Sequence, residues 1–168
     1  MFKRKSKTDT NDAPTYEVTK TDEEWRNELS PARYQVLRHA GTEPAWSGEL
    51  LHVDGEGVFR CAGCDAVLFD TDSKFDSGSG WPSFDRAKSE GTIIERRDNS
   101  HFMRRVEIVC ARCGGHLGHV FPDGPTETGM RYCVNSLSLT YDEESDGDQT
   151  GQSEPGGSGE AAGAAKGG

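Results

Sequence analysis

Cys61-Ala62-Gly63-Cys64 and Cys110-Ala111-Arg112-Cys113 are two C-x-x-C pairs separated by 45 residues, and they are the strongest signal in the sequence. A two-residue spacer lets one tight turn present two thiolates to one ion, and zinc takes four such ligands in a tetrahedron. Two disulfides or a thioredoxin-like redox pair are the alternatives. A redox pair usually stands at a helix N-terminus, and neither pair precedes a helical pattern here. The spacing therefore favours one structural zinc ion held by all four cysteines.

Around these pairs the sequence breaks into short runs of β-prone residues, interrupted by Gly, Pro, Asp and Ser. Several short strands with turns between them are typical of a mainly antiparallel β domain. The runs are residues 58–61, 66–70, 92–97, 103–110, 119–121 and 130–141.

Two short helices are predicted ahead of the strands. Thr21 and Glu24 have the spacing of a capping box, in which the two side chains bond the first free backbone N–H groups of a helix. Ser30 followed by Pro31 predicts a second helix start, and Gly41 predicts its end.

The 168-residue chain carries 29 acidic against 19 basic side chains, a formal net charge of −10. This balance argues against a nucleic-acid partner, because Lys and Arg must neutralise the phosphates. No apolar run approaches the roughly 20 residues that span a bilayer, and the basic residues 1–5 lack the apolar stretch of a secretory signal. Few large apolar side chains occur at 1–20 or 142–168. We therefore expect a flexible N-terminal segment, a folded domain at 21–141 and a disordered acidic tail.

The fifth cysteine, Cys133, lies in a predicted strand. A lone cysteine is often a small buried hydrophobe. However, the period of two in a strand puts Arg131, Cys133 and Asn135 on one face. A guanidinium beside a thiol stabilises the thiolate and lowers its pKa, which predicts a nucleophile at neutral pH. This face is a candidate reactive site.

Two other stretches are rich in polar and aromatic side chains. His116 and His119 follow the second cysteine pair, and each is a zinc ligand, a hydrogen-bonded core residue or an acid–base group. Since four cysteines already satisfy zinc, the acid–base role gains weight. Trp81 follows a Ser-Gly-Ser-Gly loop at 77–80, which is either a plain linker or a loop that offers an indole face to an apolar ligand group.

From about residue 24 to residue 141 the chain strongly resembles the methionine-R-sulfoxide reductases of the MsrB type. The resemblance rests on residues 41–44 (Gly-Thr-Glu-Pro), 61–64, 75–84, 113–125 and 131–136 (Arg-Tyr-Cys-Val-Asn-Ser). It implies a mainly β domain of two antiparallel sheets with short N-terminal helices and a four-cysteine zinc site. It also implies an enzyme that reduces methionine-R-sulfoxide with a thiol and so repairs oxidised proteins.

The resemblance assigns catalytic roles to four residues. Cys133 corresponds to the nucleophile, which attacks the sulfoxide sulfur and becomes a sulfenic acid. His119 corresponds to the proton donor for the leaving oxygen, with His116 beside it. Asn135 corresponds to a residue that lines the same site.

Three further residues correspond to the substrate-binding side of the family site. Trp81 matches the indole that packs on the terminal methyl group of the substrate, and Arg131 lines the site. Asp123 matches a turn residue that helps to position the side of the site on which the histidines lie.

Some members of the family carry a resolving cysteine where this chain has Ser79. With four cysteines assigned to zinc and Cys133 to catalysis, we expect an external thiol, thioredoxin or a similar reductant, to reduce the sulfenic acid. The expected substrate is methionine-R-sulfoxide in oxidised proteins, with the free amino acid as a second candidate. The expected enzyme is a cytoplasmic monomer without a membrane or nucleic-acid partner.

Two other classes of function stay open. A zinc-ribbon binding module needs the four cysteines but not Cys133, Asn135 or Trp81. A thiol redox sensor would use oxidation of Cys133 as a switch, without reductase activity.

Overall fold

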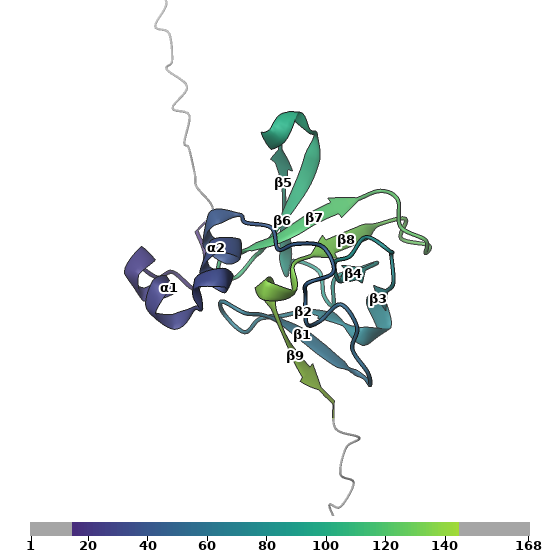
Figure 1. Ribbon diagram of the computed structural model, residues 1–168, viewed down its shortest axis with the longest axis horizontal. Helices are drawn as coiled ribbons and strands as arrows, with labels where there is room; N and C mark the ends of the chain where they lie inside the picture. The colour runs from purple at the N-terminus through teal and green to yellow at the C-terminus, as the bar shows by residue number, and fades with distance from the viewer. Residues whose placement is uncertain (1–14, 145–168) are drawn as a thin grey trace, which may run out of the picture.

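The computed structural model describes residues 15–144, which form two antiparallel sheets and two short helices (Figure 1). One sheet has the strand order β2-β1-β9 and the other the order β3-β4-β8-β7-β6-β5. The predicted mainly β fold is therefore confirmed. The strands are β1 (Gly57–Cys61), β2 (Val67–Asp70), β3 (Lys74–Phe75), β4 (Ser83–Phe84), β5 (Ile93–Asp98), β6 (Arg105–Cys110), β7 (His116–Phe121), β8 (Arg131–Val134) and β9 (Leu139–Glu143).

Most of the two terminal segments that we predict to be flexible and disordered, 1–20 and 142–168, lies outside the described residues. Of the first segment, residues 15–20 are described, and there the Val18 amide donates a hydrogen bond of 2.9 Å to the Arg112 carbonyl oxygen. This bond ties the chain to the second cysteine pair before the first helix begins.

Both helix starts are as predicted. In α1 (Asp22–Glu28) the Glu24 amide donates to Thr21 Oγ1 at 3.2 Å, and the Thr21 amide donates to Glu24 Oε2 at 2.8 Å, which completes the capping box. In α2 (Pro31–His39) the N-cap is Ser30, and the helix ends at His39 with Ala40 as a left-handed cap, φ 50°, directly before Gly41. Neither helix within residues 15–144 is long and apolar enough to cross a membrane.

Three buried phenylalanines join the two sheets. The Phe84 ring from the six-stranded sheet stacks on Phe69 at a centroid distance of 4.2 Å and meets Phe59 edge-on at 4.9 Å; both partners belong to the three-stranded sheet. Aromatic pairs at these distances add attraction beyond the area that they bury. This core fixes the back of the six-stranded sheet.

The run 130–141 is not one strand, and that prediction is wrong. β8 ends at Val134, a 3₁₀ turn (η3, Ser136–Ser138) follows, and β9 then pairs with β1 in the other sheet. The buried Ser138 hydroxyl donates to the His116 carbonyl oxygen at 2.8 Å, which holds the turn against β7. The chain therefore crosses between sheets directly after Cys133.

Candidate active site

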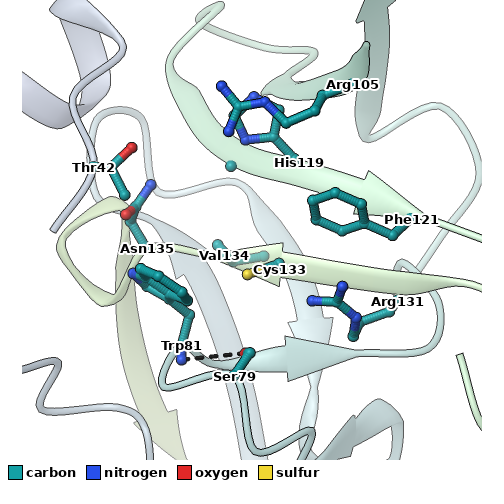
Figure 2. A pocket seen from close by; sticks show the side chains of 11 residues that line it. Thr42, Ser79, Trp81, Arg105, His119, Phe121, Arg131, Cys133, Val134 and Asn135 are labelled. Carbon is teal, nitrogen blue, oxygen red and sulfur yellow. Dashed lines mark hydrogen bonds between the residues drawn. The ribbon is translucent and has the colours of Figure 1, made fainter. Parts of the chain in front are cut away.

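A cavity of about 290 Å³ opens on the six-stranded sheet where β7 and β8 run side by side (Figure 2). Five of the seven predicted site residues line it, while His116 and Asp123 each contact one of those five. The complete lining is Thr42, Ser79, Trp81, Arg105, Gly118, His119, Phe121, Arg131, Cys133, Val134 and Asn135.

The register of the sheet brings the reactive residues together. β8 pairs with β7 so that Cys133 lies opposite His119, and Arg131 lies opposite Phe121. Directly paired residues project from the same face of a sheet, so these four side chains share one face. Tyr132 projects from the other face and packs on Phe69 in the core.

Burial raises the pKa of the Cys133 thiol above its ordinary value, and this effect outweighs the Arg131 charge and a hydrogen bond with Ser79, which both lower it. The prediction that Arg131 makes Cys133 a thiolate at neutral pH is therefore wrong in its net direction. The charge of Arg131 also acts on Asp123, because Arg131 Nε and Nη2 donate to the two carboxylate oxygens of Asp123 at 2.9 and 3.1 Å. The resting group at neutral pH is the protonated thiol.

This balance predicts opposite effects for two substitutions. Arg131→Gln removes a charge that lowers the Cys133 pKa, so the pKa rises further and alkylation of Cys133 by iodoacetamide at pH 8 should slow severalfold, because the thiolate is the reactive form. Asp123→Asn frees the guanidinium charge and should accelerate the reaction. Peptide mass mapping of Cys133 after timed alkylation measures both rates. Equal rates in the two variants would contradict the balance.

His119 is oriented by a carboxylate from the neighbouring hairpin. Its Nε2–H donates to Asp98 Oδ2 at 2.7 Å. Burial lowers the pKa of His119, against the raising effect of Asp98, and hydrogen bonds with Ser100 and His119 hold the pKa of Asp98 below its ordinary value. The ring is therefore neutral near pH 7 with its proton on Nε2, and Nδ1 is the nitrogen that can accept a proton.

His116 lies behind this site. Its ring centroid is 5.6 Å from that of His119, and its Nδ1–H donates to Glu107 Oε2 at 2.6 Å. The side chain is buried and does not line the cavity. The structure thus makes His116 a neighbour of His119, and its predicted part in catalysis stays a prediction.

Trp81 and Asn135 are both held by Glu43. The Glu43 carbonyl oxygen accepts from the indole Nε1–H of Trp81 at 3.0 Å, and the Glu43 amide donates to Asn135 Oδ1 at 3.0 Å. Asn135 Nδ2 in turn donates to the Leu117 carbonyl oxygen at 3.0 Å. The Glu43 side chain, 3% exposed, accepts from the Leu137 amide at 2.9 Å. One buried residue therefore sets the indole and the amide relative to each other.

Sequence reasoning did not single out Asp98, Glu107, Arg105 or Glu43. Asp98 and Arg105 pair directly between β5 and β6, and Glu107 pairs with His119 between β6 and β7. Glu107 lies within the predicted run 103–110, so its alternation was visible, whereas Asp98 lies one residue beyond the predicted run 92–97 and is the last residue of β5. The register that turns both side chains toward the histidines was not visible.

The four cysteines of the C-x-x-C pairs meet at one point. Their Sγ atoms all lie within 4.8 Å of one another, with 3.7 Å between Cys61 and Cys113 and 3.5 Å between Cys64 and Cys110. Zinc–sulfur bonds of about 2.3 Å in a tetrahedron require sulfurs about 3.8 Å apart. All five cysteines of the chain are free thiols in the structure, so the donor set fits a metal ion such as zinc better than two disulfides.

The two cysteine turns come from different sheets. The first connects β1 to β2 and the second connects β6 to β7. The Gly63 and Gly115 amides each donate to a cysteine sulfur at 3.4 Å, which favours the thiolate form that a metal needs. Gly114 supplies the left-handed residue of the second turn, with φ 74°, whereas Asp65, with φ 68°, and not Gly63, supplies that of the first. A metal here would tie the two sheets together.

Comparison with known proteins decides the family. The model of the SelR domain matches residues 29–143, more than half of the chain. The chain belongs to the SelR family. The SelR match contains all seven predicted site residues and the four clustered cysteines.

Relatives of this SelR chain carry the name peptide methionine sulfoxide reductase MsrB. The protein of Leptospira interrogans is 53% identical over 77% of this chain and 98% of its own. Those of Bradyrhizobium diazoefficiens and Methanosarcina barkeri are 57% and 51% identical, over 73% and 79% of this chain and 88% and 93% of their own. The resemblance of the sequence to MsrB-type reductases is therefore confirmed.

Among solved structures, the Mis18 Yippee-like domain matches 54% of the SelR chain and 99% of its own, with a TM-score of 0.42 and 18% identity. This likeness is too weak to bear on function.

Proposed function

We propose that this chain is a peptide methionine-R-sulfoxide reductase in which Cys133 is the nucleophile. Membership of the SelR family and the MsrB relatives, 53% and 57% identical over most of their length, support the activity. One observation carries the role of Cys133: the thiol lies opposite His119 in a cavity that also contains the Trp81 indole. An indole face suits the apolar S-methyl group of the substrate, and water occupies such a position poorly.

In the reductase step, the Cys133 sulfur attacks the sulfoxide sulfur and forms a transient bond between the two sulfurs. The oxygen then passes to the Cys133 sulfur, and both the sulfur–oxygen bond of the substrate and the transient sulfur–sulfur bond break. The products are methionine and the Cys133 sulfenic acid. The substrate sulfur gains two electrons and the Cys133 sulfur loses two. The proton that the thiol gives up at the start is carried by the sulfenic acid at the end, so the step needs no other proton donor.

His119 moves this proton. The neutral ring, with Nε2–H on Asp98, takes the thiol proton at Nδ1 and thereby creates the nucleophile only when substrate is bound. The resulting imidazolium then protonates the sulfoxide oxygen as the sulfur–oxygen bond breaks. This sequence agrees with a resting thiol of raised pKa. Asn135, fixed by Glu43 and Leu117, lines the cavity beside the reacting atoms.

An external thiol restores the enzyme. Two reductant thiol groups and the sulfenic acid give a disulfide, water and the Cys133 thiol. Cys133 is the one cysteine in the cavity lining, and Ser79 stands on the loop before Trp81. These facts support a protein dithiol such as thioredoxin as the reductant.

The proposal includes a catalytic domain at residues 21–141 that acts as a monomer in the cytoplasm. None of the five cysteines is in a disulfide, which suits a reducing compartment. In the part of the chain that the structure describes, the exposed large apolar side chains are Trp46, Phe102 and Met103, too few for an obligate interface. The acidic balance of the chain argues against nucleic acid.

The proposed metal is one structural zinc ion held by Cys61, Cys64, Cys110 and Cys113. The sulfur cluster, with its spacing and its amide–sulfur hydrogen bonds, supports this choice. Zinc with four thiolates has no open position for a substrate, so its contribution is folding energy. The chemistry then belongs to Cys133 and its neighbours.

Separated epimers of a methionine sulfoxide peptide test the activity. With dithiothreitol as the reductant, the R epimer should be converted to methionine and the S epimer should remain, as chromatography of the products would show. Reduction of the S epimer alone, or of neither epimer, would refute the proposed function. A binding module or a thiol sensor would give no methionine from either.

A further inference from the structure

Three serine hydroxyls form a hydrogen-bonded chain in and next to the loop before Trp81. Ser77 Oγ lies 2.8 Å from Ser79 Oγ and 2.7 Å from Ser83 Oγ. Ser83 Oγ donates to the Trp81 carbonyl oxygen at 3.1 Å. Ser83 is fully buried in β4, whereas Ser77 and Ser79 are half-buried. We call Ser77, Ser79 and Ser83 the serine chain, and it leads from an interior carbonyl group to Ser79.

The Ser79 end of the serine chain lies at the reactive thiol. Ser79 and Cys133 both line the active-site cavity, and the Ser79 hydroxyl is a hydrogen-bond partner of the Cys133 sulfur. Ser83 pairs with Cys133 between β4 and β8, so these two side chains project from the same face of the sheet. The Trp81 amide donates to Ser79 Oγ at 3.4 Å, as the dashed line in Figure 2 shows. The backbone therefore holds the Ser79 oxygen beside the cavity.

The number of protons fixes the direction of the hydrogen bonds in the serine chain. Each hydroxyl has one proton to donate, and a carbonyl oxygen only accepts. Ser83 gives its proton to the Trp81 carbonyl oxygen, so the bond between Ser77 and Ser83 uses the proton of Ser77. The bond between Ser79 and Ser77 then uses the proton of Ser79. In the resting enzyme all three protons therefore point away from Cys133.

We propose that Ser79 is a further catalytic residue, whose hydroxyl proton turns from Ser77 to the Cys133 sulfur when the thiolate forms. A hydrogen bond to an ionised group is about twice as strong as one between neutral groups, so the negative sulfur attracts this proton more than the Ser77 oxygen does. The Ser77 oxygen still accepts from the Ser79 amide at 3.3 Å. The hydroxyl rotates without losing its proton, and His119 takes the thiol proton as before. The inference rests on the proposed function and adds a residue to its mechanism.

Other charged groups also act on Cys133 and stay in place when the serine chain is changed. The charge of Arg131 lowers the pKa of the thiol and the charge of Glu43 raises it. His119 lies opposite Cys133 in the sheet, and Arg105 lines the same cavity. Since these four side chains are common to all variants of the serine chain, a difference between the variants reports the hydroxyl.

The pH dependence of Cys133 alkylation by iodoacetamide tests the proposal, because the rate follows the fraction of thiolate. Peptide mass mapping between pH 7 and pH 11 gives the midpoint. Ser79→Ala should raise this midpoint by about 0.5 to 1 pH unit, since the thiolate loses a hydrogen bond. Ser77→Ala removes the acceptor that holds the Ser79 proton and should lower the midpoint. Ser79→Thr keeps the hydroxyl and should match the wild type, as should Ser89→Ala, an exposed serine outside the cavity lining.

Reduction of an R-sulfoxide peptide with dithiothreitol gives the second measurement. Ser79→Ala should lower kcat at pH 7 by about three- to tenfold and leave KM within about twofold, because the hydroxyl acts on the nucleophile and not on the substrate. A loop that is merely loosened would expose the thiol in both alanine variants and shift both midpoints in one direction.

Three results would overturn the inference while the reductase proposal stands: an unchanged midpoint in Ser79→Ala, an unchanged kcat in that variant, or midpoint shifts of the same sign in Ser79→Ala and Ser77→Ala. A wild type that reduces neither sulfoxide epimer would instead refute the reductase proposal. The titration needs no turnover, so it would still show whether Ser79 donates to the thiolate.

Discussion

Replacing Cys133 by serine is expected to lower the rate of methionine-R-sulfoxide reduction by at least about a thousandfold. A serine hydroxyl keeps its proton at neutral pH. Its oxygen also cannot accept the substrate oxygen, as the Cys133 sulfur does when it becomes a sulfenic acid. The thiol lies opposite His119, so the substitution leaves the proton carrier, the indole and the cavity in position. Single-turnover chromatography of an R-sulfoxide peptide, with enzyme in excess, measures the loss.

The folded state should survive this substitution. Cys133 lies outside the cluster of four cysteines, and serine is nearly isosteric, so the zinc content and the unfolding midpoint should match those of the wild type. If the serine variant turned over substrate at the wild-type rate, another residue would be the nucleophile, and the proposed mechanism would be refuted. A wild type that oxidises at Cys133 in peroxide but forms no methionine would instead favour the sensor.

One turnover without reductant should also mark Cys133 itself. The intact mass should rise by one oxygen, and dimedone should label Cys133, because sulfenic acid reacts with it. A disulfide between Cys133 and any of the other four cysteines would contradict direct reduction by an external thiol. The structure argues against that bond, since those four sulfurs face one another.

Local pattern was enough to predict the cysteine cluster and the reactive face of β8. Two C-x-x-C turns need only their own spacing, and the alternation of Arg131 and Cys133 is a property of a single strand. Asp98 and Glu107 are different, because each reaches a histidine through the register of neighbouring strands, from β5 across β6 to β7 for Asp98 and from β6 to β7 for Glu107. A single sequence does not specify that register, so these carboxylates looked like ordinary solvated charges.

The charge state of Cys133 also lay beyond sequence reasoning. Arg131 is two residues away on the same face, and its effect on the pKa has the predicted sign. What reverses the net shift is burial, which depends on how the loop around Ser79 and Trp81 covers the thiol. The prediction of one strand over 130–141 is wrong for a related reason. The 3₁₀ turn at Ser136–Ser138 is fixed by contacts with Glu43 and His116, which are far away in sequence.

Replacing Cys110 by serine is expected to reduce the free energy of unfolding by several kcal/mol, on the order of 5. Cys110 is fully buried at the end of β6, and its partner sulfur on Cys64 belongs to the turn between β1 and β2. With one ligand lost, the ion no longer ties the six-stranded sheet to the three-stranded sheet, and a serine hydroxyl is left among apolar neighbours. Most of the stability of a domain of this size would be lost.

Urea unfolding followed by tryptophan fluorescence, together with the zinc content per chain, measures this effect, and Cys133→Ser is the matched cysteine control. The wild type should contain one zinc per chain, and a strong chelator should lower its unfolding midpoint toward that of Cys110→Ser. Full stability without zinc would show that the phenylalanine core alone holds the two sheets. An intact mass lower by two hydrogens for each cysteine pair would restore the disulfide alternative. If zinc and stability fall together in Cys110→Ser while Cys133→Ser loses only activity, the five cysteines divide into four that build the fold and one that performs the reaction.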